Sequence, residues 1–135
     1  MLKSSQRILI ADDDRAVRNL LASVVEAEGY TPVMVDDGRK AYRTLQTDAD
    51  FRAGIFDMVL PNLPGLDLIS YMKSEKRLQR IPVMMTTANI NIEQTAKGFR
   101  AGAAVLLPKP FTAAQLQTTL RMLLTMSAGT LNSRN

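Results

Sequence analysis

Short apolar runs along the chain alternate with longer stretches in which apolar residues recur at helical spacing. A short β-rich run that is closed by polar or turn-forming residues is typical of a strand buried in a sheet. The pattern predicts strands at Ile8–Ala11, Thr31–Val35, Arg52–Phe56, Ile81–Met85 and Ala103–Leu107. A helical pattern follows each of them, which indicates repeated βα units.

The first and last helices carry recognisable starting signals. Asp14 stands where we expect an N-cap, since a short acidic side chain can accept a hydrogen bond from the first turn. Thr112 is expected to begin the last helix, because Gln115 follows at the spacing of a capping box. Five βα units predict one α/β domain: a doubly wound, five-stranded parallel sheet in the order 2-1-3-4-5, with helices on both faces.

The domain limits follow from the same pattern. We place the domain at residues 6–125, preceded by an N-terminal extension at 1–5 and followed by a polar tail or linker at 126–135, which we expect to be flexible. No repeat or second domain is evident.

The composition limits the chemical groups that a functional site in this chain can use. Among its 135 residues the chain has neither histidine nor cysteine, which excludes disulfides, imidazole bases, thiol nucleophiles and metal sites built on those ligands. The remaining groups are carboxylates, hydroxyls and lysine. No apolar run approaches the roughly 20 residues of a membrane-spanning helix, and the first residues lack the pattern of a signal peptide. We therefore expect a cytoplasmic protein without membrane insertion.

The formal charge of +4 is unevenly distributed. Residues 1–60 carry 8 basic and 10 acidic side chains, whereas residues 61–135 carry 9 and 3. One basic cluster lacks interleaved aromatic residues and a recognition helix, so we interpret it as a solvated helix end and expect no direct nucleic-acid contact. Its members are Lys73, Lys76, Arg77 and Arg80.

Polar residues follow four of the five predicted strands. The ligand site of an open α/β sheet lies beyond the carboxyl ends of its strands, where the strand order reverses. The residues at these strand ends should therefore meet at one edge. They are Asp12–Asp14, Asp57, Thr86–Thr87 and Pro108–Pro110.

The charges at this edge predict a divalent cation. Asp12, Asp13 and Asp57 contribute −3 and Lys109 contributes +1, which leaves −2. Oxygen ligands favour Mg²⁺ or Mn²⁺ over softer metals, and Mg²⁺ commonly completes its shell with water and phosphate oxygens. The implied substrate is a phosphoryl group, and Asp57 can act as its nucleophile to give an acyl phosphate.

Four ordered segments resemble the receiver domain of two-component response regulators, over roughly residues 6–125. They are Ile8–Asp14, Phe56–Gly65, Ile81–Ala88 and Gly102–Phe111. The resemblance implies a flavodoxin-like (βα)5 fold and a single-domain regulator similar to the chemotaxis receivers. It also implies a partner, either a sensor histidine kinase or a histidine phosphotransfer protein, whose phosphohistidine phosphorylates Asp57.

The resemblance further implies a role for each site residue. Asp12 and Asp13 match the acid pair that binds Mg²⁺, together with Asp57 and the backbone carbonyl of Val59. Thr87 matches the hydroxyl that moves toward the phosphoryl group. Lys109 matches the ammonium that binds a phosphoryl oxygen, and its bond to Pro110 is expected to be cis. These movements would alter a surface made by the fourth helix, the fifth strand and the fifth helix, and so change binding of a downstream protein target.

Some positions depart from the family pattern. Leu106 stands where the family usually has an aromatic switch residue, and Pro64 stands where an acid often precedes the glycine of the acceptor loop. Val59 and Asn89 occupy positions that tune attack of water on the acyl phosphate in the family. Because an apolar Val59 cannot orient a water molecule, we expect a long-lived phosphoryl group and only slow self-dephosphorylation.

Other functions remain open from the sequence. An aspartyl-phosphate hydrolase of similar topology would also need an aspartate nucleophile, Mg²⁺ and lysine, but such enzymes place a second acid where this chain has Val59. Flavin binding is disfavoured by the acids after the first strand. The chain could act alone or be the receiver part of a longer DNA-binding or enzymatic regulator, and its oligomeric state is open.

Overall fold

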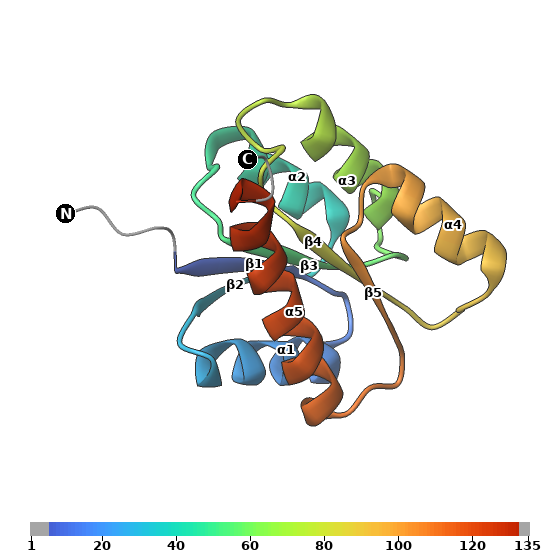
Figure 1. Cartoon of the computed structure of the whole chain (residues 1–135). Helices are drawn as coiled ribbons and strands as arrows, with labels where there is room; N and C mark the ends of the chain where they lie inside the picture. The colour runs from blue at the N-terminus through green and yellow to red at the C-terminus, as the bar shows by residue number, and fades with distance from the viewer. Residues whose placement is uncertain (1–5, 133–135) are drawn as a thin grey trace.

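The five strands form one parallel sheet in the order β2-β1-β3-β4-β5, which confirms the predicted topology. The structure is a computed structural model that describes residues 6–132 (Figure 1). The strands are β1 (Arg7–Ala11), β2 (Thr31–Val35), β3 (Ala53–Asp57), β4 (Val83–Thr87) and β5 (Val105–Pro108).

The helices cover both faces of the sheet (Figure 1). One face is covered by α1 (Arg15–Ala27) and α5 (Ala113–Asn132). The other face is covered by α2 (Gly38–Thr47), α3 (Gly65–Ser74) and α4 (Ile92–Ala101). Within residues 6–132 no helix combines the length and the apolar character needed to cross a membrane.

Each face of the sheet has its own apolar core. All five residues of β3 are buried, as expected for a central strand covered on both sides. Phe56 and Leu9 pack toward α2 and α3, whereas Ile55 and Ile10 pack toward α1 and α5. Each fully buried apolar side chain of this kind contributes roughly 1.5–3 kcal/mol of burial free energy.

Three strands begin later than the hydrophobic pattern predicts. The strand expected at Ile81–Met85 is β4, which starts after Pro82 and continues to Thr87. Pro82 has no N–H to donate, but its carbonyl accepts the Gly54 N–H at 3.0 Å. The strand expected at Ala103–Leu107 starts at Val105, because the Ala103 N–H bonds back to α4. The third strand is shifted by one residue and ends on Asp57 itself.

The last helix is longer than expected. It begins as predicted with a capping box: the Thr112 N–H donates to Gln115 Oε1 (2.9 Å), and the Gln115 N–H donates to Thr112 Oγ1 (3.1 Å). The helix then continues to Asn132, beyond the domain end predicted at residue 125. Residues 126–132 contain no proline, the residue that most strongly interrupts a helix. Residues 1–5 and 133–135 lie outside the described part of the chain.

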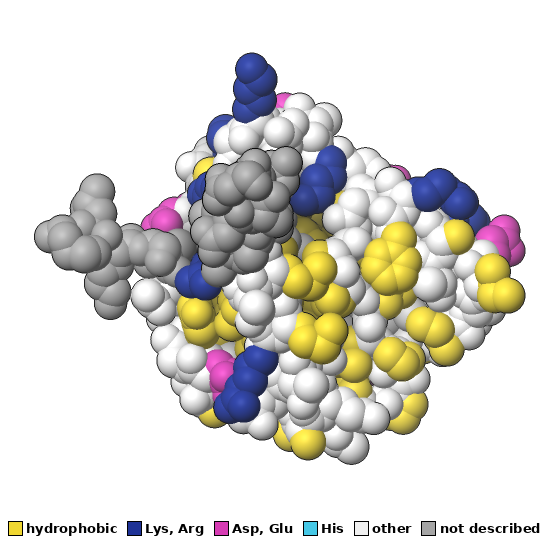
Figure 2. Space-filling model, in the orientation of Figure 1, with side chains coloured by type: hydrophobic (Ala, Val, Ile, Leu, Met, Phe, Trp, Pro, Cys, Tyr) yellow, Lys and Arg dark blue, Asp and Glu magenta, His cyan; other side chains and the backbone are white. Residues whose placement is uncertain are grey.

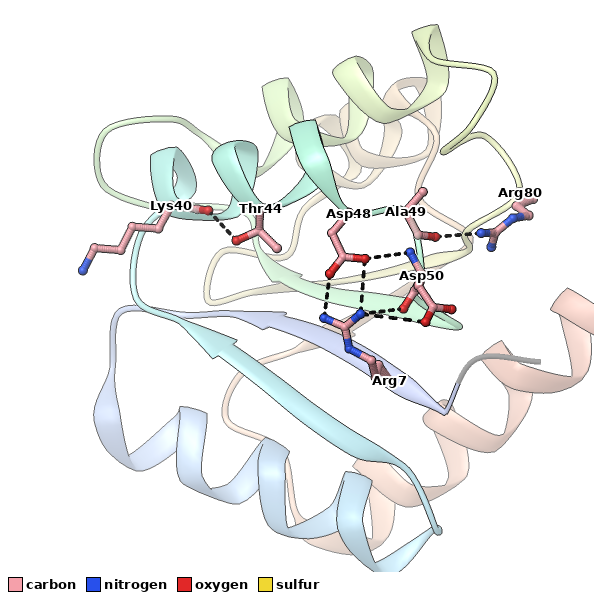
Figure 3. A network of polar contacts seen from close by, with 7 residues as sticks. All are labelled: Arg7, Lys40, Thr44, Asp48, Ala49, Asp50 and Arg80. Carbon is pink, nitrogen blue, oxygen red and sulfur yellow. Dashed lines mark hydrogen bonds and ion pairs between the residues drawn. The ribbon is translucent and has the colours of Figure 1, made fainter. Parts of the chain in front are cut away.

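A polar network fixes the loop between α2 and β3, at the end of β1 away from Asp12 (Figure 3). Arg7 begins β1, and its guanidinium donates to both carboxylate oxygens of Asp48 at 2.8 and 3.2 Å. It also donates to the Asp50 carbonyl at 3.2 Å and lies 4.4 Å from the ring centroid of Phe51. A planar cation that meets a carboxylate and a ring together holds this loop more firmly than a single surface contact.

The basic cluster after α3 is not simply a solvated helix end. Arg80 donates to the carbonyls of Ala49 (2.7 Å) and Phe51 (3.2 Å), and Figure 3 shows the first of these bonds. Arg77 donates to the Gln46 carbonyl at 3.2 Å. These side chains satisfy main-chain acceptors in the last turn of α2 and in the loop that follows it, so part of the positive charge in the second half of the chain is structural.

Candidate functional site

The candidate site lies where the strand order reverses. The chain leaves β1 toward β2 on one side and places β3 on the other, so the carboxyl ends of β1 and β3 form the switch point. Asp12 directly follows β1, and Asp57 ends β3. The register pairs Ala11 with Phe56, so the two aspartates leave the sheet at the same level.

Three carboxylates and one ammonium meet at this point, as the strand order predicts. Carboxylate oxygens of Asp12, Asp13 and Asp57 lie within 4.8 Å of one another. Lys109 Nζ lies 2.8 Å from Asp57 Oδ2 and 3.0 Å from Asp12 Oδ2. Asp12 is fully buried and Asp57 is 7% exposed, whereas Asp13 lies open to solvent. The cluster is therefore closed at its base and open on the side of Asp13.

Asp12 is held through its side chain and its main chain. Its Oδ1 accepts the Asp14 N–H at 2.9 Å, and its carbonyl accepts Arg18 Nη1 at 2.9 Å. Asp14 in turn caps α1 by accepting the Val17 N–H at 3.1 Å, as predicted. Burial raises the pKa of Asp12 above its usual value, although the Asp14 N–H and Lys109 partly oppose this.

Asp12 Oδ2 is the unsatisfied atom of the site. It is buried without a hydrogen bond of acceptable geometry, and its near neighbour is the Lys109 ammonium at 3.0 Å. A buried carboxylate oxygen in this position is costly unless a cation completes its environment.

Lys109 lies just beyond β5, and its side chain is 18% exposed. Burial lowers the pKa of its ammonium, but the hydrogen bond to Asp57 and the close negative charges of Asp57 and Asp12 outweigh burial, so the pKa is raised overall. The Lys109 side chain therefore remains positively charged. The bond between Lys109 and Pro110 is cis, as the resemblance implied.

The loop after Asp57 folds back over the carboxylate. The Val59 N–H donates to Asp57 Oδ1 at 3.1 Å, while the Met58 N–H donates to the Thr86 carbonyl of β4 at 2.8 Å. The Gly65 N–H returns to the Met58 carbonyl at 3.1 Å. A Cβ on Gly65 would overlap the Asp57 carbonyl oxygen, so this close return requires glycine.

The structure also places the remaining predicted residues. Thr87 ends β4 and is buried, and its Oγ1 accepts the Asn89 N–H at 3.1 Å. Leu106 is half-buried and packs on the core beneath α4, next to Gly98. The Val59 side chain is 74% exposed. None of these residues contacts the carboxylate cluster through its side chain in the described contacts.

The residues present fit a hard divalent cation. All three acidic side chains offer oxygen, the donor type that Mg²⁺ and Mn²⁺ prefer. The buried and unsatisfied Asp12 Oδ2 is the observation that favours such an ion, because one ammonium cannot neutralise three carboxylates.

Fold and site together define a class of protein: a doubly wound α/β domain with a carboxylate cluster and a lysine at its switch point. A family model of the response regulator receiver domain matches residues 8–121. The chain therefore belongs to the response regulator receiver domain family, a class of signalling modules in two-component signal transduction.

Relatives agree with this assignment. The chain is 35% identical over 118 residues to Response regulator MprA of Mycolicibacterium vanbaalenii. The aligned region covers 87% of this chain and 50% of that relative. The chemotaxis response regulator CheY4 of Vibrio cholerae superimposes with a TM-score of 0.83 at 26% identity, covering 90% of this chain and all of that one.

A further solved structure is the receiver domain of the sensor histidine kinase PA1611 from Pseudomonas aeruginosa. It has a TM-score of 0.79 at 26% identity, and the alignment covers 90% of this chain and 99% of that one. That structure is described with a magnesium ion coordinated in its active site cleft. The present chain spans about half the length of the curated relatives that it matches.

Two contacts near the site were not anticipated from the sequence. Arg18 holds the Asp12 carbonyl, and Asn62 in the acceptor loop donates to Asp37 at 2.9 Å. Arg18 could have been singled out as a basic residue early in the helix that follows the acid run. Asn62 carried no comparable signal, because its partner is 25 residues away.

Proposed function

We propose that Asp57 accepts a phosphoryl group from the phosphohistidine of a sensor histidine kinase or a histidine phosphotransfer protein. The observation that carries the proposal is the position of Lys109, whose ammonium contacts Asp57 at 2.8 Å and Asp12 at 3.0 Å. A cation in this place can bind an oxygen of a phosphoryl group on Asp57, which is the positioning role that phosphoryl transfer requires.

In the proposed transfer one bond to phosphorus forms and one breaks. A carboxylate oxygen of Asp57 attacks phosphorus, an O–P bond forms, and the P–N bond to the donor imidazole breaks. The imidazole nitrogen leaves with the bonding electrons and takes a proton from solvent. Because these 135 residues include no histidine, the donor phosphohistidine lies outside this domain.

The ligands for Mg²⁺, or for Mn²⁺, would be the carboxylates of Asp12, Asp13 and Asp57 with the backbone carbonyl of Val59. When bound, the ion would neutralise phosphoryl oxygens and carboxylates. Asp13 lies at the open side of the cluster, where water and a phosphoryl donor can enter.

Phosphorylation would add a charge of about −1.5 to −2 to this buried site. Thr87 and Lys109 would then turn toward the phosphoryl group, and Leu106 and the segment around Pro110 would respond. Figure 2 shows hydrophobic side chains gathered over α4, β5 and α5. Ile92 and Phe99 of this face are 89% and 48% exposed. We assign this face to a downstream protein target.

The chain would serve as a signalling phosphoacceptor in the cytoplasm, with only slow self-dephosphorylation. Because it spans half of its curated relatives, a receiver that controls an output domain in a longer regulator is the second candidate. In both cases the chemistry of Asp57 is the same.

Incubation with acetyl phosphate and Mg²⁺, followed by intact mass measurement, tests the proposal. We expect wild type to gain one phosphoryl group and Asp57→Asn, which keeps the shape of the side chain, to gain none. EDTA should abolish the gain. Equal labelling of both proteins, or labelling that persists in EDTA, would contradict the proposed site.

A further inference from the structure

The tip of the acceptor loop is held by the N-terminus of α2. The Gly38 N–H donates to the Pro61 carbonyl at 3.0 Å, and Asn62 Nδ2 donates to Asp37 Oδ2 at 2.9 Å. The base of the same loop carries Asp57 and Val59. Two residues outside the carboxylate cluster, Asp37 and Gly38, are therefore tied to the segment that carries the acceptor.

Asp37 performs two tasks with its two oxygens. Its Oδ1 caps α2 by accepting the Lys40 N–H at 2.7 Å, while Oδ2 holds the amide of Asn62. The pKa of Asp37 is lowered by the Lys40 N–H first and by Asn62 second, so the carboxylate is ionised when it holds the loop. One side chain thus couples the start of a helix to the shape of a loop.

Asn62 adopts an unusual backbone conformation. Its φ of 72° makes it the one non-glycine residue with positive φ among residues 6–132. Asparagine tolerates this region better than most residues, but the conformation persists only where surrounding contacts hold it. The bond to Asp37 supplies such a contact and thereby sets the path of the chain from Val59 to Gly65.

Gly38 lets the two segments approach. A Cβ at this position would overlap the carbonyl oxygen and carbon of Leu63, which are backbone atoms that cannot turn aside. The backbone of α2 therefore lies directly against the loop tip, and any larger residue would push the loop away.

We propose that Asp37, Asn62 and Gly38 are positioning residues for divalent-cation binding, because they fix the loop that presents Val59 beside Asp57. This inference rests on the proposed function, which assigns the Val59 carbonyl to the cation. The Val59 N–H already bonds to Asp57 Oδ1 at 3.1 Å, so a shift of the loop would disturb the carboxylate as well. Contacts one shell beyond metal ligands commonly govern metal affinity in this way.

Two substitutions separate this role from general stability. Asp37→Asn keeps a good helix cap but replaces the oxygen that accepts from Asn62. Asn62→Gly removes the amide and still allows positive φ. Asp36→Asn is the matched control, because it removes a neighbouring negative charge whose partner is Lys40, at 2.8 Å, and not the loop.

The test is a titration of the 135-residue chain with Mg²⁺, in which NMR monitors the amide signals of Val59 and its neighbours. We expect Asp37→Asn and Asn62→Gly to weaken Mg²⁺ binding by about tenfold, the low end of the effects measured for residues that support metal ligands. Asp36→Asn should stay within about twofold of wild type because exposed charges are screened. Gly38→Ala should weaken Mg²⁺ binding at least as much as Asp37→Asn and Asn62→Gly do.

The readouts separate positioning from loss of fold. Positioning predicts normal labelling by acetyl phosphate at saturating Mg²⁺, together with a nearly unchanged melting temperature in EDTA for Asn62→Gly. If both loop variants bind Mg²⁺ like the Asp36→Asn control, the inference is wrong while the proposed function stands. If wild type itself shows no saturable binding, the proposed function fails and this inference fails with it.

Discussion

The buried carboxylate of Asp12 makes the site costly for the fold when no cation is bound. We therefore expect Asp12→Asn to stabilise the cation-free protein. Asparagine can keep the hydrogen bond from the Asp14 N–H through its oxygen, so the substitution removes charge while preserving the local turn. The same substitution should abolish most Mg²⁺ binding.

The magnitude follows from the charges around Asp12. At an effective dielectric constant of about 20, two like charges 4.8 Å apart repel by roughly 3.5 kcal/mol. Asp57 and Asp13 each repel Asp12 at this range. The attraction between Asp12 and Lys109 at 3.0 Å offsets this by roughly 5.5 kcal/mol. The remaining repulsion and the burial of the charge predict stabilisation by about 1–2 kcal/mol in Asp12→Asn.

The assay is unfolding monitored by circular dichroism, in EDTA and in saturating Mg²⁺. In EDTA the melting temperature of Asp12→Asn should exceed that of wild type by about 3–8 °C. Mg²⁺ should raise the melting temperature of wild type but leave the variant nearly unchanged. Asp14→Asn is the control, since it keeps the cap of α1 and lies outside the cluster.

The pH dependence gives an independent check. Because burial raises the pKa of Asp12 in the folded state, the cost of its charge is present above that folded pKa. The cost disappears as the pH falls below the unfolded value of about 3.9. The advantage of Asp12→Asn should therefore shrink as the pH is lowered toward 4. A variant less stable than wild type in EDTA at neutral pH would refute the reasoning.

Three further predictions concern other parts of the chain. Arg7→Lys loses the two-point contact with Asp48 and should lower the free energy of unfolding by about 1 kcal/mol in urea, without changing phosphorylation. Thr112→Ala should lower it by about 1 kcal/mol, and Thr112→Ser should restore it. The phosphoryl group should outlast donor removal by minutes and be lost faster in Val59→Asn; decay of wild type within seconds would contradict this.

The site could be read from the sequence because it lies at strand ends. In a parallel sheet the carboxyl ends share one edge, so Asp12, Asp57 and Lys109 could be brought together without knowing any contact distance. The distances of 2.8 and 3.0 Å around Lys109 then follow from a topology that the apolar runs had already indicated.

The boundaries and the supporting contacts were less predictable, for physical reasons. The apolar pattern of the fourth strand runs through Pro82. Because Pro82 has no N–H to donate, β4 begins only after it. The bond from Asn62 to Asp37 depends on where two loops meet in space, and no periodicity encodes that meeting. Arg80 likewise looks like a solvated charge until the α2–β3 loop is placed beside it.

The present hydrogen bond of Thr87 affects how phosphorylation of Asp57 would change the exposed face of the domain. Its Oγ1 now accepts the Asn89 N–H, a neutral bond of about 1 kcal/mol. A bond from this hydroxyl to a phosphoryl oxygen is charge-assisted and about twice as strong, so the exchange favours inward rotation. Leu106, beside Gly98 of α4, has no hydroxyl to follow that movement. We therefore infer that repacking of Leu106 against α4, rather than a new hydrogen bond, would carry the change to the exposed face.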